Sequence, residues 1–338
     1  MSTQNDVRLP DTNKLIVSNS PHVHDRPDVR KIMLTVVAAL VPACISAVIF
    51  FGLRALWILA VTTVSCLVFE YLFSRLFHRP PSLLDGSALL TGVLLALNLS
   101  AATPWWVCVV GALLAIGLGK MLYGGLGYNP FNPALVGRVG LLIAFPGIMT
   151  TWVKPEPGKL VYDAVTTATP LGELGTNGII GTDYASYFLG NIGGCLGETS
   201  ALALLIGAIP LVWKRLIRWQ VPVFYIGTVA VISGVMHGIN PEAYAPAGFH
   251  VLTGGLMLGA IYMATDMVTS PMNPRGAVVF AVGCGIITSV IRIWGSYPEG
   301  VSFAIIFMNA LVPLIDRYTV YQPFGATREK KVKAAEAV

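Results

Sequence analysis

A hydroxyl-rich loop interrupts an otherwise apolar chain: the segment YDAVTTATPLGELGTNG, residues 162–178, holds the threonines Thr166, Thr167 and Thr169. Threonine hydroxyls can cap helices or bond to the backbone in turns. Thr169 suits an N-cap, because Pro170 follows at the first helical position and Glu173 lies in the first turns. A cap does not require Asp163, Ala168 or the other two threonines, so the composition of this loop needs a second explanation.

Three carboxylates lie in or beside long apolar runs, where a charge costs roughly 2.5 to 3.5 kcal/mol on insertion scales. Glu198, in GGCLGETSALALL, precedes a long apolar stretch. It could form an ion or proton site, accept a hydrogen bond from a cofactor, or pair with a neighbouring helix. Asp85 and Asp266 are expected near helix ends that water reaches, where capping or solvation explains them more simply than ion coupling.

Two Asn-Pro pairs punctuate the segment GLGYNPFNPALVGR, residues 125–138. Proline suits the first turn of a helix and restricts the residue before it, so the segment should end one helix and begin the next. The break would leave the amides of Asn129 and Asn132 free at membrane depth, which is tolerated only where protein or a polar cavity covers them. A ligand site and a plain helical hairpin both account for the pattern.

Motifs of soluble enzymes and metal sites are missing from the sequence. GLGKM, residues 117–121, lacks the first glycine and the Ser/Thr of a phosphate-binding loop, and no G-x-S-x-G occurs. The five cysteines stand alone in apolar runs, and His22 and His24 lie in a polar tail. We therefore assign no catalytic side chain and no metal ligand.

The composition is that of a membrane protein: 55% of residues are hydrophobic, 12% are charged and the mean hydropathy is +0.70. Soluble domains carry about 25% charged residues. The apolar runs are continuous rather than alternating, which favours helices over a β-barrel. The polar residues 1–31 contain no apolar signal-peptide core, so the first apolar run is expected to act as an uncleaved anchor.

The fold expected is an all-α polytopic membrane protein with about ten transmembrane helices. The apolar runs lie at 32–52, 55–77, 83–101, 104–123, 132–149, 184–213, 219–237, 250–267, 276–294 and 301–316. This gives an inner N-terminal tail (1–31), a first helical half (32–149), an outer loop (150–183), a second helical half (184–316) and a basic inner tail (317–338).

The distribution of Lys and Arg fixes the expected orientation. With both termini inside, eighteen basic residues fall on the inner side, Lys120 and Arg138 among them. Only four fall outside: Arg54, Lys154, Lys159 and Arg292. The threonine loop should therefore face the periplasm of a bacterial inner membrane.

A weak internal repeat points to two duplicated halves. LLTGVLLAL at 89–97 resembles VLTGGLMLG at 251–259, and NPALVGR at 132–138 loosely resembles NALVPLIDR at 309–317. Duplicated halves are common in transporters.

The stretch DAVTTATPL resembles the flavinylation motif of a membrane family that includes the D subunit of Rnf ferredoxin:NAD oxidoreductase and the B subunit of sodium-translocating NADH:quinone reductase. The resemblance extends through SPHVHDRPDVRKIMLTVVAALVPA, LLDGSALLTGVLLAL, GYNPFNPALVGR and GETSALALL, about residues 18–320. Thr167 replaces the glycine usual in the quinone-reductase branch. That departure and the short chain favour the Rnf D branch.

This resemblance implies specific roles. Thr169 would carry FMN through a phosphoester, with Asp163, Thr166 and Ala168 as motif context. The flavin would relay electrons between a periplasmic flavin subunit and other subunits, coupled to Na⁺ or H⁺ movement, after attachment by a flavin transferase. Non-covalent riboflavin could contact Asn129 and Asn132, and Glu198 and Asp266 could serve ion coupling.

Two alternatives belong to other classes. A solute channel or transporter is favoured by the repeat and by the structural likeness of the family to urea channels. A structural scaffold for redox partners is the third possibility.

Overall fold

The computed structural model describes residues 28–79, 82–158, 166–177, 183–295 and 300–319. These residues are mainly helical, and the strands described form a single two-stranded sheet. The expected all-α architecture is thereby confirmed. Asp163, both histidines of the N-terminal tail and most of the two expected tails lie outside the described residues.

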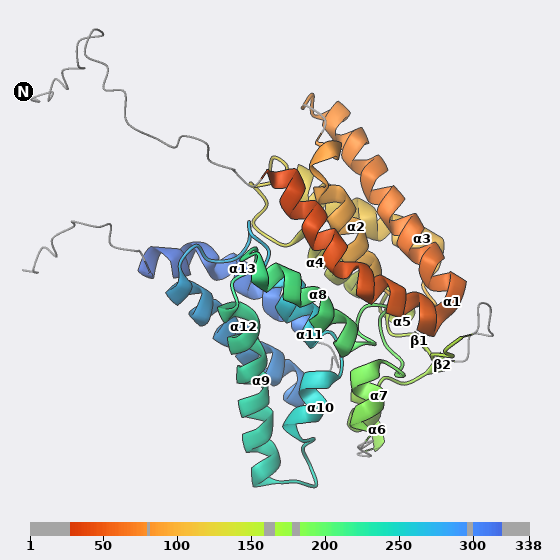
Figure 1. Cartoon of the computed structure of the whole chain (residues 1–338), viewed down its shortest axis with the longest axis vertical. Helices are drawn as coiled ribbons and strands as arrows, with labels where there is room; N and C mark the ends of the chain where they lie inside the picture. The colour runs from red at the N-terminus through yellow and green to blue at the C-terminus, as the bar shows by residue number, and fades with distance from the viewer. Residues whose placement is uncertain (1–27, 80–81, 159–165, 178–182, 296–299, 320–338) are drawn as a thin grey trace, which may run out of the picture.

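The first helix, α1 (Val29–Leu76), contains 48 residues. At about 1.5 Å per residue it is long enough to cross a ~30 Å hydrocarbon core twice. Gly52 divides it with φ 61° and ψ −149°, a conformation that glycine adopts without a steric penalty. The two arms turn back on each other at this point, so the first two expected spans form one hairpin (Figure 1).

Shorter elements complete the first half: η2 (Leu83–Asp85), α2 (Ser87–Leu97), α3 (Trp105–Leu113), the π-helix η3 (Leu114–Met121), α4 (Pro133–Ala144) and α5 (Pro146–Met149). α2 has 11 residues, which at about 1.5 Å each spans only about half of the hydrocarbon core. α4 begins as the Asn-Pro pattern predicts, because Asn132 caps it and Pro133 occupies the first turn.

The connection after α5 contains β1 (Trp152–Val153), β2 (Thr166–Thr167), α6 (Pro170–Asn177) and α7 (Tyr184–Leu189). The strands pair antiparallel, with Trp152 opposite Thr167. A non-helical segment then leads to α8 (Ala201–Trp213), which has 13 residues. The expected span 184–213 is thus a short helix, an irregular segment and a second short helix.

The remaining elements are α9 (Gln220–Ile239), α10 (Ala247–Leu252), α11 (Leu256–Leu258), the π-helix η4 (Gly259–Met263), α12 (Pro274–Trp294) and α13 (Val301–Tyr318). Among the described residues, four helices are long and apolar enough to span a membrane: α1, α9, α12 and α13. The count of ten spans is not confirmed, since 83–101, 184–213 and 250–267 each contain a helix break.

The segments that resemble each other in the internal repeat differ in local structure. Residues 89–97 lie within the continuous helix α2, whereas 251–259 cross the break between α10 and α11. Residues 132–138 open α4, but 309–317 lie in the second half of α13. The similar segments therefore differ in helix boundaries, and the division into two duplicated halves stays a prediction.

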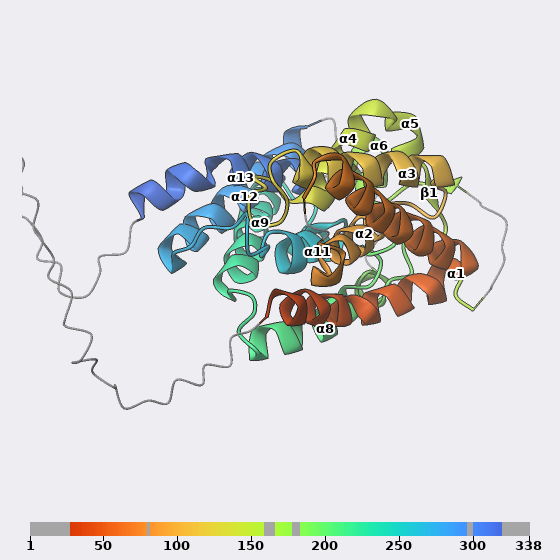
Figure 2. The ribbon, with the colours of Figure 1, turned by 90° about the horizontal axis from the view of Figure 1, so that it is seen from above.

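The helices form two groups joined at the centre. Figure 1 shows α1, α2, α3 and α4 on one side and α9, α10 and α12 on the other, and Figure 2 shows α9 and α12 apart from α3 and α4. α8 packs against α1, and α13 packs against both α12 and α4, so the groups share contacts. One large apolar core runs through both, and the segments between broken helices pass through this core.

Candidate functional site

The threonine loop is held by strand pairing and by one close contact. Thr166 and Thr167 form β2 opposite Val153 and Trp152. A Cβ added to Gly193 would lie 2.5 Å from Cγ2 of Thr167. Gly193 thus lets Thr167 lie against the segment after α7, and Thr167 acquires a packing role that its sequence position did not reveal.

Thr169 occupies the N-cap position before α6, as the alternative interpretation predicted. Its Oγ1 accepts a hydrogen bond from the Gly172 N–H at 3.0 Å, and the residue is 6% exposed. Thr169 also lines a small pocket together with Glu198 and Gly254. The structure therefore brings the predicted acceptor threonine and the predicted intramembrane carboxylate to one place, although 29 positions separate them in the sequence.

A larger cavity of about 290 Å³, here called the threonine cavity, adjoins this pocket. Thr167, Ala168 and Pro170 line it, together with Lys154, Pro155, Asp183, Ser186, Tyr187, Asn191, Ile192 and Gly193. Hydrogen bonds from the Ser186 hydroxyl and N–H hold the pKa of Asp183 below its ordinary value. Among the described residues that line it, the cavity presents one cation, Lys154, and one carboxylate, Asp183, which caps α7.

Two irregular segments meet at the centre of the fold. The Leu196 N–H donates to the Leu99 carbonyl at 2.9 Å, and the Gly197 N–H donates to the Leu97 carbonyl at 2.7 Å. A Cβ on Gly197 would lie 2.6 Å from Cβ of Leu97, so glycine permits this approach. The backbone groups freed by the end of α2 and the start of α8 are satisfied by each other, as membrane depth requires.

Arg138 of α4 contacts both segments of this junction. Its Nη1 donates to the Asn98 carbonyl at 2.7 Å and to the Asn98 Oδ1 at 2.8 Å, and it lies 3.1 Å from the Cys195 sulfur. The Glu198 carboxylate lies 3.4 Å from the same nitrogen. The sequence interpretation missed Arg138 and counted it among the inner loop cations, whereas the structure buries it against two broken helices.

Asn129, Asn132 and Asp266 line one cavity, here called the asparagine cavity. Its other polar lining residues are Ser87, Thr91, Lys120, Tyr262 and Thr265. The remaining lining residues are apolar. The grouping of these three sequence-predicted residues depends on the tertiary structure, because Asp266 follows η4 in the other half of the chain. Glu198 does not line this cavity, so the two proposed ion-coupling carboxylates occupy separate places.

Both asparagine side chains have protein partners. Asn132 Oδ1 accepts from the Ala134 N–H at 3.1 Å, and its Nδ2 donates to the Met263 carbonyl at 3.1 Å. Asn129 Oδ1 accepts from the Gly127 N–H, and its Nδ2 donates to the Phe131 carbonyl. Protein groups thus satisfy both amides, and the two residues are buried beside the cavity.

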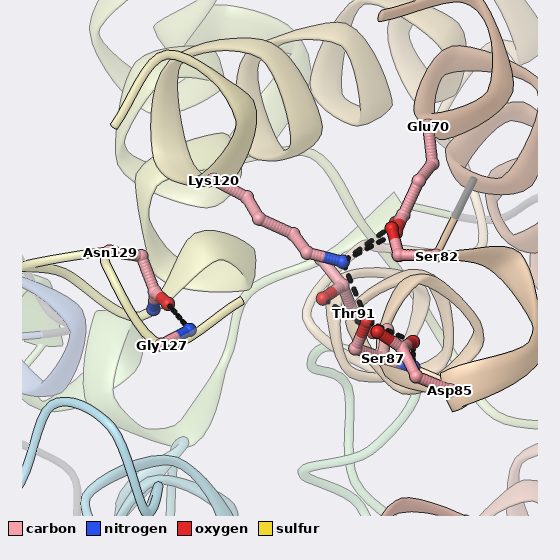
Figure 3. Close-up of polar contacts among 8 residues, drawn as sticks. All are labelled: Glu70, Ser82, Asp85, Ser87, Thr91, Lys120, Gly127 and Asn129. Carbon is pink, nitrogen blue, oxygen red and sulfur yellow. Dashed lines mark hydrogen bonds and ion pairs between the residues drawn. The ribbon is translucent and has the colours of Figure 1, made fainter. Parts of the chain in front are cut away.

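A buried charged network borders the asparagine cavity (Figure 3). Lys120 Nζ lies 2.7 Å from each carboxylate oxygen of Glu70 and donates to the Ser87 hydroxyl at 2.6 Å. The Ser82 hydroxyl bonds to Glu70, and Asp85 accepts from the Ser87 N–H and hydroxyl. Lys120 is 1% exposed and Glu70 is fully buried, so Lys120 is not the inner loop cation that the sequence count assumed.

Glu70 was also overlooked in the sequence, although a signal was present. It lies within the apolar stretch LVFEYLF, and an ionisable residue in a membrane span is a functional or paired residue by default. The partner could not be named from sequence, since 50 positions separate Glu70 from Lys120. Removing Lys120 and Arg138 from the inner count still leaves a strong excess of inner cations.

Shared pockets and polar contacts lie between the threonine loop and the asparagine cavity. Glu198 lines the pocket of Thr169 and also a second small pocket with Arg138, Asn98 and Met263. Asn98 Nδ2 lies 3.5 Å from the Met263 sulfur, and the Met263 carbonyl accepts from Asn132. Polar groups therefore extend from the threonine loop to the asparagine cavity. Among the described residues, no group of three His, Cys, Asp or Glu could hold a metal ion.

Comparison with known proteins agrees with this architecture. A sequence model of the family described as NQR2, RnfD, RnfE matches residues 16–325. The D subunit of the proton-translocating ferredoxin:NAD(+) oxidoreductase complex of Clostridium ljungdahlii is 42% identical, over 94% of this chain and 98% of the relative. The D subunit of the Na(+)-translocating ferredoxin:NAD(+) oxidoreductase complex of Acetobacterium woodii is also 42% identical, over 94% and 97%.

A third relative is the D subunit of the ion-translocating oxidoreductase complex of Stutzerimonas stutzeri, 42% identical over 92% of this chain and 96% of its own. The matched region includes the threonine loop, the asparagine cavity and the central junction. The chain thus belongs to the NQR2, RnfD, RnfE family.

Proposed function

We propose that this chain is the D-type membrane subunit of an Rnf-type ion-translocating ferredoxin:NAD oxidoreductase and works with the other subunits of that complex. The observation that supports this most strongly is near full-length similarity to three subunits with this role. One of these relatives belongs to a complex named as proton-translocating and another to a complex named as Na⁺-translocating. Both are 42% identical to this chain, so overall similarity favours neither ion.

Within this role, Thr169 is the proposed attachment point of FMN. The flavin, when bound, supplies one- and two-electron redox chemistry, and the protein supplies position and electrostatics. The threonine cavity, at about 290 Å³, is close to the lower end of the range for ligand pockets, about 300–1,000 Å³. Lys154 provides a cation for a phosphoryl group, and Tyr187 an aromatic surface. Thr169 itself lines the adjoining small pocket, and its neighbours Ala168 and Pro170 line the cavity. The residues beside the attachment point therefore suit the group.

The asparagine cavity is the proposed site of non-covalent riboflavin. Flat cofactors favour apolar walls with a few polar groups at the edges, and Asn129, Asn132, Thr91 and Tyr262 stand among apolar side chains here. The free volume is about 60 Å³, so side chains such as Leu126 and Met267 must move outward to admit a flavin ring.

The central junction would then separate the two flavin positions. Glu198 is the proposed ion-coupling carboxylate there, because it contacts Arg138 and lines pockets on two sides. Asp266 is the proposed carboxylate at the asparagine cavity, with Thr269 donating to its Oδ2 at 3.0 Å. The orientation proposed places the threonine loop in the periplasm, where a flavin transferase and a periplasmic flavin subunit would reach it.

A solute channel is the second candidate, because broken helices that meet at mid-depth also occur in transporters. The direct backbone pairing of Leu97 and Leu99 with residues 196–197 argues against it. These segments and Arg138 fill the centre with buried groups. A redox subunit requires no open path there, whereas a channel does.

The flavin proposal is tested by expressing the full chain with its flavin transferase and measuring flavin fluorescence on a denaturing gel. We expect a fluorescent band for the native chain, Thr166→Ala and Thr167→Ala, and none for Thr169→Ala. Because Thr169 also caps α6, Thr169→Asn is the matched control: asparagine caps well but offers no hydroxyl for esterification.

Thr169→Asn is therefore expected to unfold at the same temperature as the native chain and to carry no flavin. Fluorescence that persists in Thr169→Asn, or its absence from the native band, would refute the attachment site.

A further inference from the structure

The connection between α8 and α9 gathers cations between two exposed aromatic side chains. Its sequence is WKRLIRW, residues 213–219. Trp213 is 83% exposed and Trp219 is 55% exposed. Tryptophan concentrates at membrane–water interfaces, and basic residues beside a span attract anionic headgroups. The connection therefore has the composition of a segment at headgroup depth.

A cavity of about 340 Å³, here called the arginine cavity, opens at this connection. Arg215 and Arg218 supply its charge, and Thr265 and Ser270 supply hydroxyl groups. Its other walls are mostly apolar, Ile32 among them. No acidic residue occurs among the described residues that line it. The cavity is thus cationic on one part of its lining and apolar on another.

The two arginines differ in how they are held. Arg218 Nη1 donates to the Pro271 carbonyl at 2.5 Å, which fixes its guanidinium beside the cavity. The Arg215 backbone has φ 54°, a left-handed conformation that residues other than glycine rarely adopt. In the part of the chain that the structure describes, the Arg215 side chain makes no hydrogen bond and no ion pair. One guanidinium is therefore fixed, and the other is exposed to receive an anion.

The position of the cavity indicates where that anion comes from. Ile32 lies in the first turn of α1, Val221 lies at the start of α9, and Arg215 follows the end of α8. Three helix ends at one level mark the edge of the membrane-spanning region. A phosphate bound there would have apolar side chains next to it, which suits a phosphate that carries acyl chains better than a free one.

We propose that the arginine cavity binds the headgroup phosphate of an anionic phospholipid, with Arg215 and Arg218 on the phosphate and the apolar walls along an acyl chain. The proposal is independent of flavin binding. The cavity shares Ile32, Leu216, Thr265 and Met267 with the asparagine cavity, so a bound lipid would lie next to the latter. A phosphorylated small molecule is the rival source of the same phosphate chemistry.

The test uses the full chain in detergent, titrated with phosphatidylglycerol or with phosphatidylcholine of the same acyl chains, and counts bound lipids by native mass spectrometry. We expect one tight, saturable phosphatidylglycerol and weaker phosphatidylcholine binding. Arg215→Gln should weaken the binding of phosphatidylglycerol about fivefold, since a basic residue near a lipid surface contributes about 1 kcal/mol to binding. Lys214→Gln is the matched control, because Lys214 is the neighbouring exposed cation but does not line the cavity.

Three results would overturn the proposal. Equal losses of phosphatidylglycerol binding in Arg215→Gln and Lys214→Gln would mean general attraction to the charged surface. Equal binding of the two lipids to the native chain would exclude recognition of the headgroup. Displacement of phosphatidylglycerol by millimolar inorganic phosphate or free FMN would assign the cavity to a soluble phosphate. The lipid comparison on the native chain stands even if a variant fails to fold, and Arg215→Lys should retain most of the binding.

Discussion

The described residues contain two buried ion pairs, Glu70–Lys120 and Arg138–Glu198, and the two pairs differ in geometry. In the Glu70–Lys120 pair, the ammonium lies 2.7 Å from both carboxylate oxygens, and serines bond to each partner. In the Arg138–Glu198 pair the separation is 3.4 Å, and the same Arg138 nitrogen bonds to Asn98 at 2.7 and 2.8 Å. We call the first pair closed, because one ammonium contacts both carboxylate oxygens, whereas in the second pair Arg138 is shared among Glu198, Asn98 and Cys195.

This difference separates a structural role from a functional one. A closed pair in a low-dielectric interior must keep both charges, because removing one leaves the other buried and unpaired. A carboxylate that shares its arginine with other acceptors and lines two pockets can exchange its partner for an ion or a proton. We therefore expect Glu70–Lys120 to serve mainly packing and stability, and the proposed coupling role belongs to Glu198.

The largest effect is expected from breaking the closed pair. Glu70→Gln should lower the free energy of unfolding by about 3–5 kcal/mol, because the Lys120 ammonium then lacks a counter-charge in the membrane interior. Thermal unfolding of the purified chain in detergent measures the loss. The double variant Glu70→Gln with Lys120→Met removes both charges and should recover most of the stability. A single variant as stable as the native chain would contradict the closed-pair assignment.

An intermediate effect is expected from separating the two irregular segments that position Glu198. Gly197→Ala brings a Cβ to 2.6 Å from Leu97 Cβ and should cost about 1–3 kcal/mol by overpacking. Gly227→Ala in α9 is the matched control, since a Cβ there meets nothing within 4 Å. It should be neutral or slightly stabilising. Equal melting temperatures for the two variants would mean that the junction tolerates separation.

The smallest effect on stability, with the largest effect on coupling, is expected from Glu198→Gln. The buried Arg138 guanidinium loses its counter-charge but retains its bonds to Asn98, so the stability loss should be about 1–2 kcal/mol, less than for Glu70→Gln. Ion-dependent ferredoxin:NAD oxidoreductase activity of the assembled complex should fall roughly tenfold, equivalent to about 1.4 kcal/mol. In Glu198→Asp, which keeps the charge, the activity should fall less. A stability loss as large as that of Glu70→Gln would erase the distinction.

Sequence patterns anticipated several of these features correctly. The Asn-Pro pairs predicted the start of α4, and the order Thr169, Pro170 predicted the cap of α6. Such features depend on residues a few positions apart, so local stereochemistry is sufficient to derive them. The predicted motif residue Asp163 lies outside the described residues and stays a prediction.

Other features were beyond sequence reasoning. The apolar runs 83–101 and 184–213 look like complete spans, because residues packed against protein are as apolar as residues that face lipid. Lys120 and Arg138 look like loop cations because each lies beside a glycine- or proline-rich break. Their burial follows from carboxylates 50 and 60 positions away.

By itself, the sequence determined the membrane-embedded helical class, the hydroxyl-rich loop and the order of the family segments. These follow from composition and from short-range spacing. Only the tertiary structure decided that Thr169 and Glu198 share one pocket, that Asn129, Asn132 and Asp266 share another, and that Arg138 joins the broken helices between them. Buried polar groups must find partners, and in this fold those partners come from distant parts of the chain.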